Sequence, residues 1–130
     1  MIFGVGTDLL AIQRVRDLLA RHGERFAARV LAAPEMQEYH ARAGQPEQAA
    51  RLVAKRFAVK EALGKALGMG VAFPATFHAS WLSHDALGKP LLCFDPALDA
   101  WLAERQLRVH VSLSDEQEHV LAFVVAEMDR

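Results

Sequence analysis

The longest stretch without a helix-breaking residue other than Gly64 runs from Pro46 to Leu67. A proline fits the first position of a helix, because the N–H that it lacks would have no partner inside the helix. The run Gly68-Met69-Gly70 supplies a stop signal at the other end. The pattern therefore predicts one long helix over residues 46–67. Apolar residues recur along it, so the helix needs a surface to pack against.

The last third of the chain alternates apolar and polar residues, which is typical of β-strands. Residues 107–113 alternate in this way, residues 115–118 form a polar turn, and residues 119–127 predict the returning strand of a hairpin. A second pair of strands is predicted near residues 77–81 and 91–94, around a turn at 83–90. A short strand is predicted over residues 2–8. Strands gathered late and helices gathered early predict the α+β class, with early helices packed on an antiparallel sheet.

Shorter helices fill most of the remaining chain. They are predicted over residues 12–22 and 24–31, from Pro34 onward, and over residues 96–106. Gly23 is the expected C-cap of the first of them. Thr7 or Asp8 is its expected N-cap, because a short side-chain oxygen can accept from the free N–H groups of a first turn. We expect one domain over residues 1–130, since domains usually hold roughly 100–200 residues.

Composition excludes several classes of protein. Fifteen Lys and Arg residues face sixteen Asp and Glu residues, a formal charge of −1, and nucleic-acid binding usually shows a strong basic excess. No apolar run approaches the ~18 residues of a membrane span. The single cysteine, Cys93, excludes an internal disulfide framework. The first residues lack the basic leader of a secretory signal. We expect a cytoplasmic protein with neither a membrane nor a nucleic acid as partner.

The segment Gly4-Val5-Gly6-Thr7-Asp8 is the first candidate for chemistry. Its two glycines allow the backbone to approach a neighbouring chain or ligand closely. A carboxylate at the end of a strand can hold a hard cation. The simpler alternative is that Asp8 only caps the following helix.

A second candidate lies on the long helix. Glu61 and Lys65 are four residues apart and share one helical face. Lys55, Arg56 and Lys60 add positive charge suited to phosphate groups. The alternative is an ordinary Glu–Lys pair on the surface. Gly64 relieves crowding in either reading, against another helix or against a ligand.

A third candidate is the segment His110-Val111-Ser112-Leu113-Ser114-Asp115. In a strand, the two serines and His110 face the same side. The alternative is a polar row that only faces solvent. These residue types could also form a Ser-His-Asp hydrolase site, but the sequence contains no nucleophile-elbow motif that would support that function.

Taken together and in order, these segments resemble the holo-acyl-carrier-protein synthase family of 4′-phosphopantetheinyl transferases. The matching residues are 4–8, Arg56-Phe57-Ala58-Val59-Lys60-Glu61-Ala62, Lys65-Ala66-Leu67-Gly68, Gly88-Lys89-Pro90 and His110-Val111-Ser112-Leu113-Ser114. The resemblance covers essentially the whole chain and implies the α+β fold of that family. It also implies Mg²⁺-dependent transfer of 4′-phosphopantetheine from coenzyme A to a serine of acyl carrier protein, a step in fatty acid biosynthesis that releases adenosine 3′,5′-bisphosphate.

The resemblance also implies roles for individual residues. Asp8 and Glu61 match the metal ligands, and Glu61 and Lys65 match catalytic positions. Positions that line the coenzyme A site correspond to Arg56, Lys60, Lys65, Gly68, Pro90, His110 and Ser112. Arg14 and Arg21 match arginines that dock the acidic carrier protein. The family implies a homotrimer with active sites between neighbouring subunits, and it leaves the general base open between Glu61 and a metal-held water.

Two departures keep rival functions open. Met69 stands where the family usually has threonine, and Ala11 stands where an acidic residue is common. A noncatalytic carrier-binding module would tolerate both losses. A nucleotide-binding structural trimer is the other alternative. Many relatives have histidine at the position of Asp115, to which we assign no catalytic role.

Overall fold

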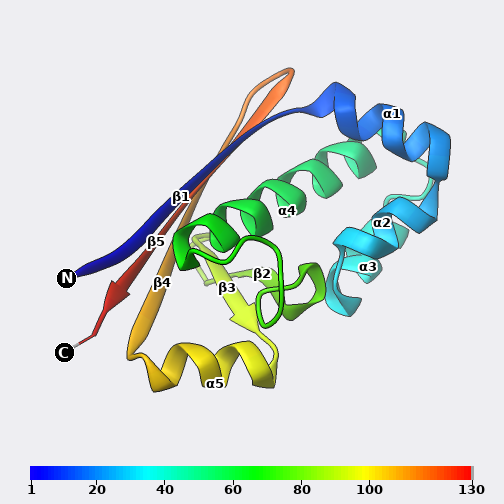
Figure 1. The fold of residues 1–130 in the computed structure, drawn as a ribbon. Coiled ribbons are helices and arrows are strands. Elements are labelled where there is room, and N and C mark those ends of the chain that lie inside the picture. The colour runs from blue at the N-terminus through cyan, green and yellow to red at the C-terminus, as the bar shows by residue number, and fades with distance from the viewer. Residues whose placement is uncertain (130) are drawn as a thin grey trace.

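A computed structural model describes residues 1–129 of the chain, and its elements follow one another from a first strand to a last one (Figure 1). The helices are α1 (Ile12–His22), α2 (Glu24–Val30), α3 (Ala33–His40), α4 (Pro46–Leu67) and α5 (Pro96–Glu104). The strands are β1 (Ile2–Ala11), β2 (Ser80–His84), β3 (Pro90–Phe94), β4 (Leu107–Asp115) and β5 (His119–Met128). The predicted α+β class is confirmed.

The strands form two antiparallel sheets. The larger has the order β1–β5–β4, with the first strand of the chain beside the last, and the smaller pairs β2 with β3. The predicted hairpin of the last two strands is therefore confirmed. The pairing of β1 with β5 runs from Ile2 opposite Glu127 to Ala11 opposite His119.

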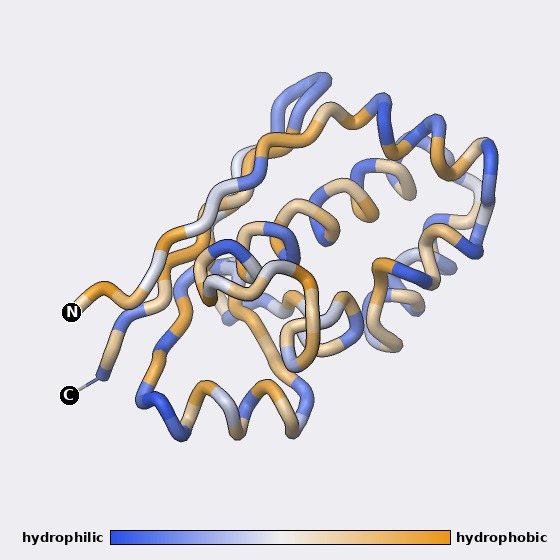
Figure 2. Tube along the Cα trace, viewed as in Figure 1, coloured by the Kyte–Doolittle hydropathy of each residue, from blue (hydrophilic) through white to orange (hydrophobic). Residues whose placement is uncertain are grey.

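Helix α4 lies along one face of the larger sheet and forms the centre of the molecule (Figure 1). Its bounds agree with those predicted, and Gly68 ends it in the left-handed conformation with φ of 81°. The sheet residues that face it are small or β-branched, and four of them are completely buried: Val120, Ala122, Val124 and Ala126. Figure 2 shows apolar residues along the strands and the helix where they meet.

Two glycines of β1 allow the strand to lie directly on the helix. A Cβ atom at Gly4 would overlap the carbonyl oxygen of Ala66, and one at Gly6 would overlap the carbonyl oxygen of Ala62. The partner that the glycines approach is therefore α4 of the same chain. Gly64 is crowded in a similar way by the backbone of Gly70, just after the helix ends.

The remaining helices cover the ends of this central layer. Helices α1, α2 and α3 gather around the N-terminal half of α4, and α5 lies on the other side of the molecule, next to β3 and β4 (Figure 1). None of the helices in residues 1–129 is both long and apolar enough to cross a membrane.

Three predicted boundaries were wrong. Strand β1 continues through Asp8 to Ala11, because β5 supplies pairing partners along its whole length, so neither Thr7 nor Asp8 caps α1. Residues Phe77–Ala79 form a 3₁₀ turn, and strand β2 begins only at Ser80. Helix α5 ends at Glu104, and Gln106 turns the chain with φ of 53°.

Candidate functional site

Strand β1 and helix α4 bring three of the predicted site residues together. Asp8 lies on the strand, two residues after Gly6, and Glu61 and Lys65 lie on the facing helix. The ammonium group of Lys65 donates to the carbonyl oxygen of Thr7 at 2.7 Å and lies 3.4 Å from Oδ1 of Asp8. Residues far apart in sequence therefore meet where the glycines of β1 allow close approach. We call Asp8, Glu61 and Lys65 the carboxylate cluster.

The charges of this cluster act on Glu61. Burial raises the pKa of Glu61, and the nearby negative charge of Asp8 raises it further, while Lys65 and Arg14 oppose the shift. Two carboxylates close enough to disfavour each other's ionisation are stabilised by a cation that neutralises both. The raised pKa of Glu61 therefore indicates a position suited to a shared positive charge.

Asp8 and Glu61 fit a divalent metal ion. Oδ2 of Asp8 is buried, and no hydrogen-bond partner for it occurs in residues 1–129. A buried carboxylate oxygen without a partner is costly, and a cation would remove that cost. No third metal-binding side chain joins them in the described part of the chain. Mg²⁺ commonly takes one or two carboxylates and completes its shell with waters and phosphate oxygens.

A second cluster surrounds a groove of about 500 Å³ on another side of α4. Its lining comes from α3, α4, β2, β3 and β4, and we call it the basic groove. Four cationic side chains and two carboxylates line it: Arg42, Arg51, Lys55, Arg56, Glu38 and Asp115. Among the predicted coenzyme A residues, Arg56 and Pro90 lie here. Its volume falls in the usual range for small-molecule sites.

Arg56 lies mostly inside the protein beside this groove. It is 5% exposed, and its Nη2 atom donates to Oε2 of Glu38 at 3.2 Å. Its Nε atom is 3.5 Å from Oε2 of Glu35 and has no hydrogen-bond partner among the described residues. A positive charge is therefore held at the groove with part of its donor capacity unused.

Lys60 does not reach either cluster. It is 2% exposed, and its ammonium group donates to the carbonyl oxygens of Val30 and Phe77 and to Oε1 of Glu35, at 2.6 to 2.7 Å. These three bonds use all its donors, and burial lowers its pKa. The structure thus gives Lys60 an internal role in place of the expected contact with coenzyme A.

His110 and Ser112 lie on the outer face of the larger sheet. They pair with Val125 and Phe123 of β5, whereas Asp8 shares the inner face with the glycines of β1. Nε2 of His110 lies 2.8 Å from Oε1 of Glu127, a contact that lowers the pKa of that carboxyl group. The fold of the chain does not bring these residues to the carboxylate cluster.

The two arginines expected to meet a carrier protein lie on α1. Arg14 and Arg21 are both exposed and are seven residues apart, so they share one side of the helix. Arg14 is also close enough to Glu61 to lower its pKa. The predicted docking surface therefore borders the carboxylate cluster.

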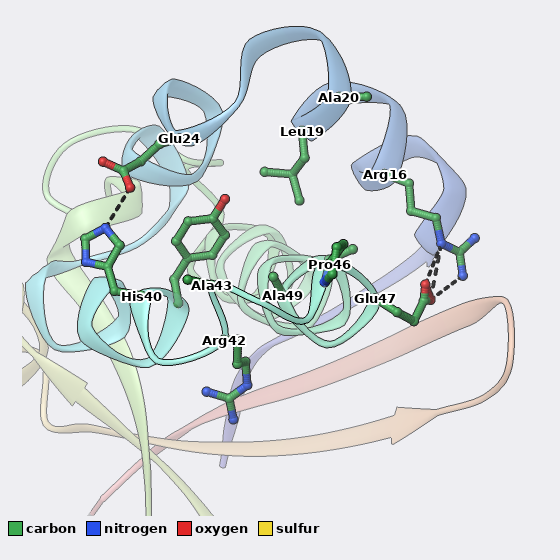
Figure 3. A pocket seen from close by; sticks show the side chains of 12 residues that line it. Arg16, Leu19, Ala20, Glu24, His40, Arg42, Ala43, Pro46, Glu47 and Ala49 are labelled. Atoms are coloured by element: carbon green, nitrogen blue, oxygen red, sulfur yellow. Dashed lines mark hydrogen bonds and ion pairs between the residues drawn. The ribbon is translucent and has the colours of Figure 1, made fainter.

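A further cavity of about 540 Å³ lies between α1, α2, α3 and the start of α4 (Figure 3). Leu19 points into it, and ion pairs lie at two sides: Arg16 to Glu47 at 2.6 Å, and His40 to Glu24 at 2.7 Å. None of the predicted site residues lines this cavity.

Sequence reasoning missed two cations of the basic groove, Arg42 and Arg51. Arg51 and Lys55 are four residues apart and so share a face of α4, which is the signal that would have linked them. Arg42 follows α3 and gave no such signal.

Comparison with known proteins decides the family. A family model described as the 4′-phosphopantetheinyl transferase superfamily matches residues 4–124. The chain belongs to this superfamily. Two similar relatives within it share one name. The holo-[acyl-carrier-protein] synthase of Aromatoleum aromaticum is 54% identical over 127 residues, which is 98% of each chain, and that of Vibrio cholerae is 45% identical over 98% of each chain.

Solved structures of superfamily members agree with this. The holo-[acyl-carrier-protein] synthase of Neisseria meningitidis has a TM-score of 0.89 at 45% identity and matches 98% of this chain and 99% of its own. That of Bacillus anthracis, solved in complex with CoA (3′,5′-ADP), has a TM-score of 0.82 at 29% identity and matches 99% of both chains. The resemblance inferred from the sequence is confirmed.

Proposed function

We propose that this chain is a holo-[acyl-carrier-protein] synthase that transfers 4′-phosphopantetheine from coenzyme A to a serine of apo acyl carrier protein and releases adenosine 3′,5′-bisphosphate. The observation that carries the proposal is the meeting of Asp8 and Glu61 beside Lys65. Relatives of that name at 54% identity and the coenzyme-bound Bacillus anthracis structure support it.

The reaction requires charge to be neutralised around a pyrophosphate. The carrier serine attacks the phosphorus bonded to pantetheine, and the bond from that phosphorus to the bridging oxygen breaks. Such transfers depend on positioning and on electrostatic stabilisation more than on covalent help. Lys65, with a half-exposed ammonium group next to Asp8, neutralises or protonates the leaving oxygen. Glu61, or a water beside it, accepts the serine proton.

Mg²⁺ fits this arrangement. Asp8 and Glu61 would hold the ion, and the ion would neutralise charge on the pyrophosphate of coenzyme A when bound. Oδ2 of Asp8 supports this assignment, because it is buried and has no hydrogen-bond partner among residues 1–129. Lys65 keeps the Asp8 carboxylate in place through Oδ1, so that a cation meets a positioned ligand.

We also propose that active sites form between subunits of a homotrimer. The carboxylate cluster lies at the β1 edge of the sheet and the basic groove lies by the β4 edge, with β5 between them. The outer face of this sheet is apolar and exposed at Val5, Leu9 and Phe123. Self-association through that face would bury it and would bring His110 and Ser112 of one subunit to a neighbour.

The carrier protein is proposed to dock on α1. Carrier proteins are expected to be acidic, and Arg14 and Arg21 present positive charge on one side of the helix. Charge complementarity of this kind speeds association and fixes orientation. Because Arg14 borders Glu61, docking there would deliver the serine to the carboxylate cluster.

Intact mass spectrometry tests the proposal. The protein is mixed with apo carrier, coenzyme A and Mg²⁺, and the carrier is expected to gain the mass of one phosphopantetheine group. Glu61→Gln should remove the gain, because the site loses one of its two carboxylates. Glu104→Gln is the matched control. Glu104 is largely exposed, and its ion pair with the neighbouring Arg105 is long, at 3.7 Å. Coenzyme A binding without any mass gain by the wild-type protein would support the noncatalytic alternative instead.

A further inference from the structure

Asp115 bridges two cations of the basic groove. Its Oδ1 atom accepts from Nη1 of Arg51 at 2.9 Å, and its Oδ2 atom lies 2.9 Å from the ammonium group of Lys55. Arg51 and Lys55 are one turn apart on α4, whereas Asp115 ends β4. One carboxylate therefore neutralises two of the four cations that line the groove.

The two cations differ in what else holds them. Arg51 also donates to the backbone carbonyl oxygens of Glu116 and Gln117 in the turn after β4. For Lys55, the contact with Asp115 is the one ion pair found in the described residues. Both side chains of this pair are about one-third exposed, so an incoming ligand can reach them. Lys55 is the cation that a ligand can take over at the smallest structural cost.

We infer that Asp115 is the internal counter-anion of the basic groove, which an incoming phosphate group must displace from Lys55. The carboxylate and the phosphate compete for the same ammonium group. Asp115 therefore lowers the affinity of the free protein for phosphate-bearing ligands and makes release of the bisphosphate product easier. This inference rests on the proposed function, because it takes the 3′-phosphate of coenzyme A to be the ligand of the groove, while the pyrophosphate lies at the carboxylate cluster.

The competition has a second consequence at the turn. When a phosphate takes Lys55, the Asp115 carboxylate keeps Arg51, whose guanidinium also holds the two turn carbonyls. The turn stays anchored, and only the contact with Lys55 is exchanged. Asp115 thus changes ligand affinity without being needed for the fold, which makes it suitable for substitution.

Calorimetry with adenosine 3′,5′-bisphosphate tests the inference. The titration is done without carrier and with a chelator present, so that no metal ion at the carboxylate cluster contributes. Asp115→Asn should bind the bisphosphate about fivefold more tightly, the size expected for one partly exposed ion pair. The gain should shrink at high salt, because screening weakens the contact in the wild-type protein.

A double-mutant cycle separates competition from a general effect of charge. Lys55→Met should weaken binding, and Asp115→Asn should then change the affinity less than twofold, since the contested cation is gone. Glu116→Gln is the matched control. It removes the same charge from the next residue, whose side chain forms no hydrogen bond or ion pair with Arg51 or Lys55 within residues 1–129.

The inference would be overturned by unchanged or weaker binding by Asp115→Asn, by an equal gain in the Lys55→Met background, or by an equal gain with Glu116→Gln. Absence of binding by both wild-type and Asp115→Asn proteins would overturn it as well. The proposed function fails by a different result, namely no mass gain on the carrier. If the protein showed the affinity pattern but no transfer, the counter-anion role of Asp115 would stand and the proposed synthase activity would not.

Discussion

Gly6 of β1 lies against Ala62 of α4 with no side chain between the two backbones. Residues on one face of a strand are two apart, so Asp8 follows Gly6 on the side that faces the helix. Glu61 precedes Ala62 on that helix. The same close approach therefore sets the positions of both proposed metal ligands.

Gly6→Ala is expected to destabilise the protein. Its Cβ would overlap the carbonyl oxygen of Ala62, and backbone atoms cannot move aside as a flexible side chain would. Overpacking of this kind costs about 1–3 kcal/mol, and urea denaturation measures it. Gly44→Ala is the matched control, because a Cβ there meets nothing within 4 Å. Equal free energies of unfolding for the two variants would contradict the close packing.

Binding of Mg²⁺ should weaken on acidification earlier than at an ordinary glutamate. A metal ion requires the ionised carboxylate, and burial together with Asp8 raises the pKa of Glu61. As the pH falls through this raised pKa, Glu61 takes up a proton and the affinity for Mg²⁺ drops. Calorimetric titrations with Mg²⁺ at a series of pH values measure the midpoint. A midpoint at or below the usual glutamate pKa would rule out the assignment.

The same shift affects stability without metal. A carboxyl group whose pKa is higher in the folded state makes its ionised form unfavourable to folding at neutral pH. Glu61→Gln should therefore have a slightly larger free energy of unfolding than the wild type at neutral pH. The difference should disappear below the usual glutamate pKa, where Glu61 is protonated in both states.

Lys60→Met should be strongly destabilising. It leaves Glu35, which is completely buried, without the cation that lies 2.6 Å away, and breaking a buried pair costs about 3–5 kcal/mol. Replacing both residues by methionine should recover part of the loss, because the lysine and the glutamate are then removed together and Arg56 keeps its pair with Glu38. Chemical denaturation of the single and double variants measures this. A Lys60→Met protein of wild-type stability that binds the bisphosphate poorly would instead favour the expected ligand contact.

Phe123→Asp should reduce the oligomeric state. Phe123 is 41% exposed on the outer face of the sheet, and a charge there would be buried without a partner by self-association. Light scattering after size exclusion measures the mass, and transfer activity should fall with it. Leu87→Asp serves as the control, since Leu87 is 96% exposed in the turn between β2 and β3. An unchanged mass for Phe123→Asp would place the interface elsewhere.

Features set by neighbouring residues in the sequence were predictable. Helix α4 was predicted with its bounds, because Pro46, the apolar spacing and Gly68 are all local signals. The hairpin of β4 and β5 followed from alternation and a polar turn. The shared helix face of Glu61 and Lys65 followed from their spacing, but their meeting with Asp8 was expected only through the family resemblance, since nothing local joins Asp8 to that helix.

Features that depend on tertiary contacts were not predictable. The full length of β1 is set by β5, its partner from the other end of the chain, so the cap at Asp8 was a wrong prediction. The internal role of Lys60 depends on two carbonyl groups, those of Val30 and Phe77, whose positions no sequence pattern reveals. The residue type alone does not distinguish a buried lysine from a ligand-binding lysine.

Helix α4 carries both Lys55 of the basic groove and Glu61 of the carboxylate cluster. The helix therefore sets the distance and the rotation between the two sites. Six residues of an α-helix rise by about 9 Å, and each residue is rotated about the helix axis by about 100° relative to the one before it. An insertion or deletion between these two positions would swing one cluster around the axis relative to the other. Spacing within this stretch is consequently fixed, and the two clusters can diversify only by exchange of side chains.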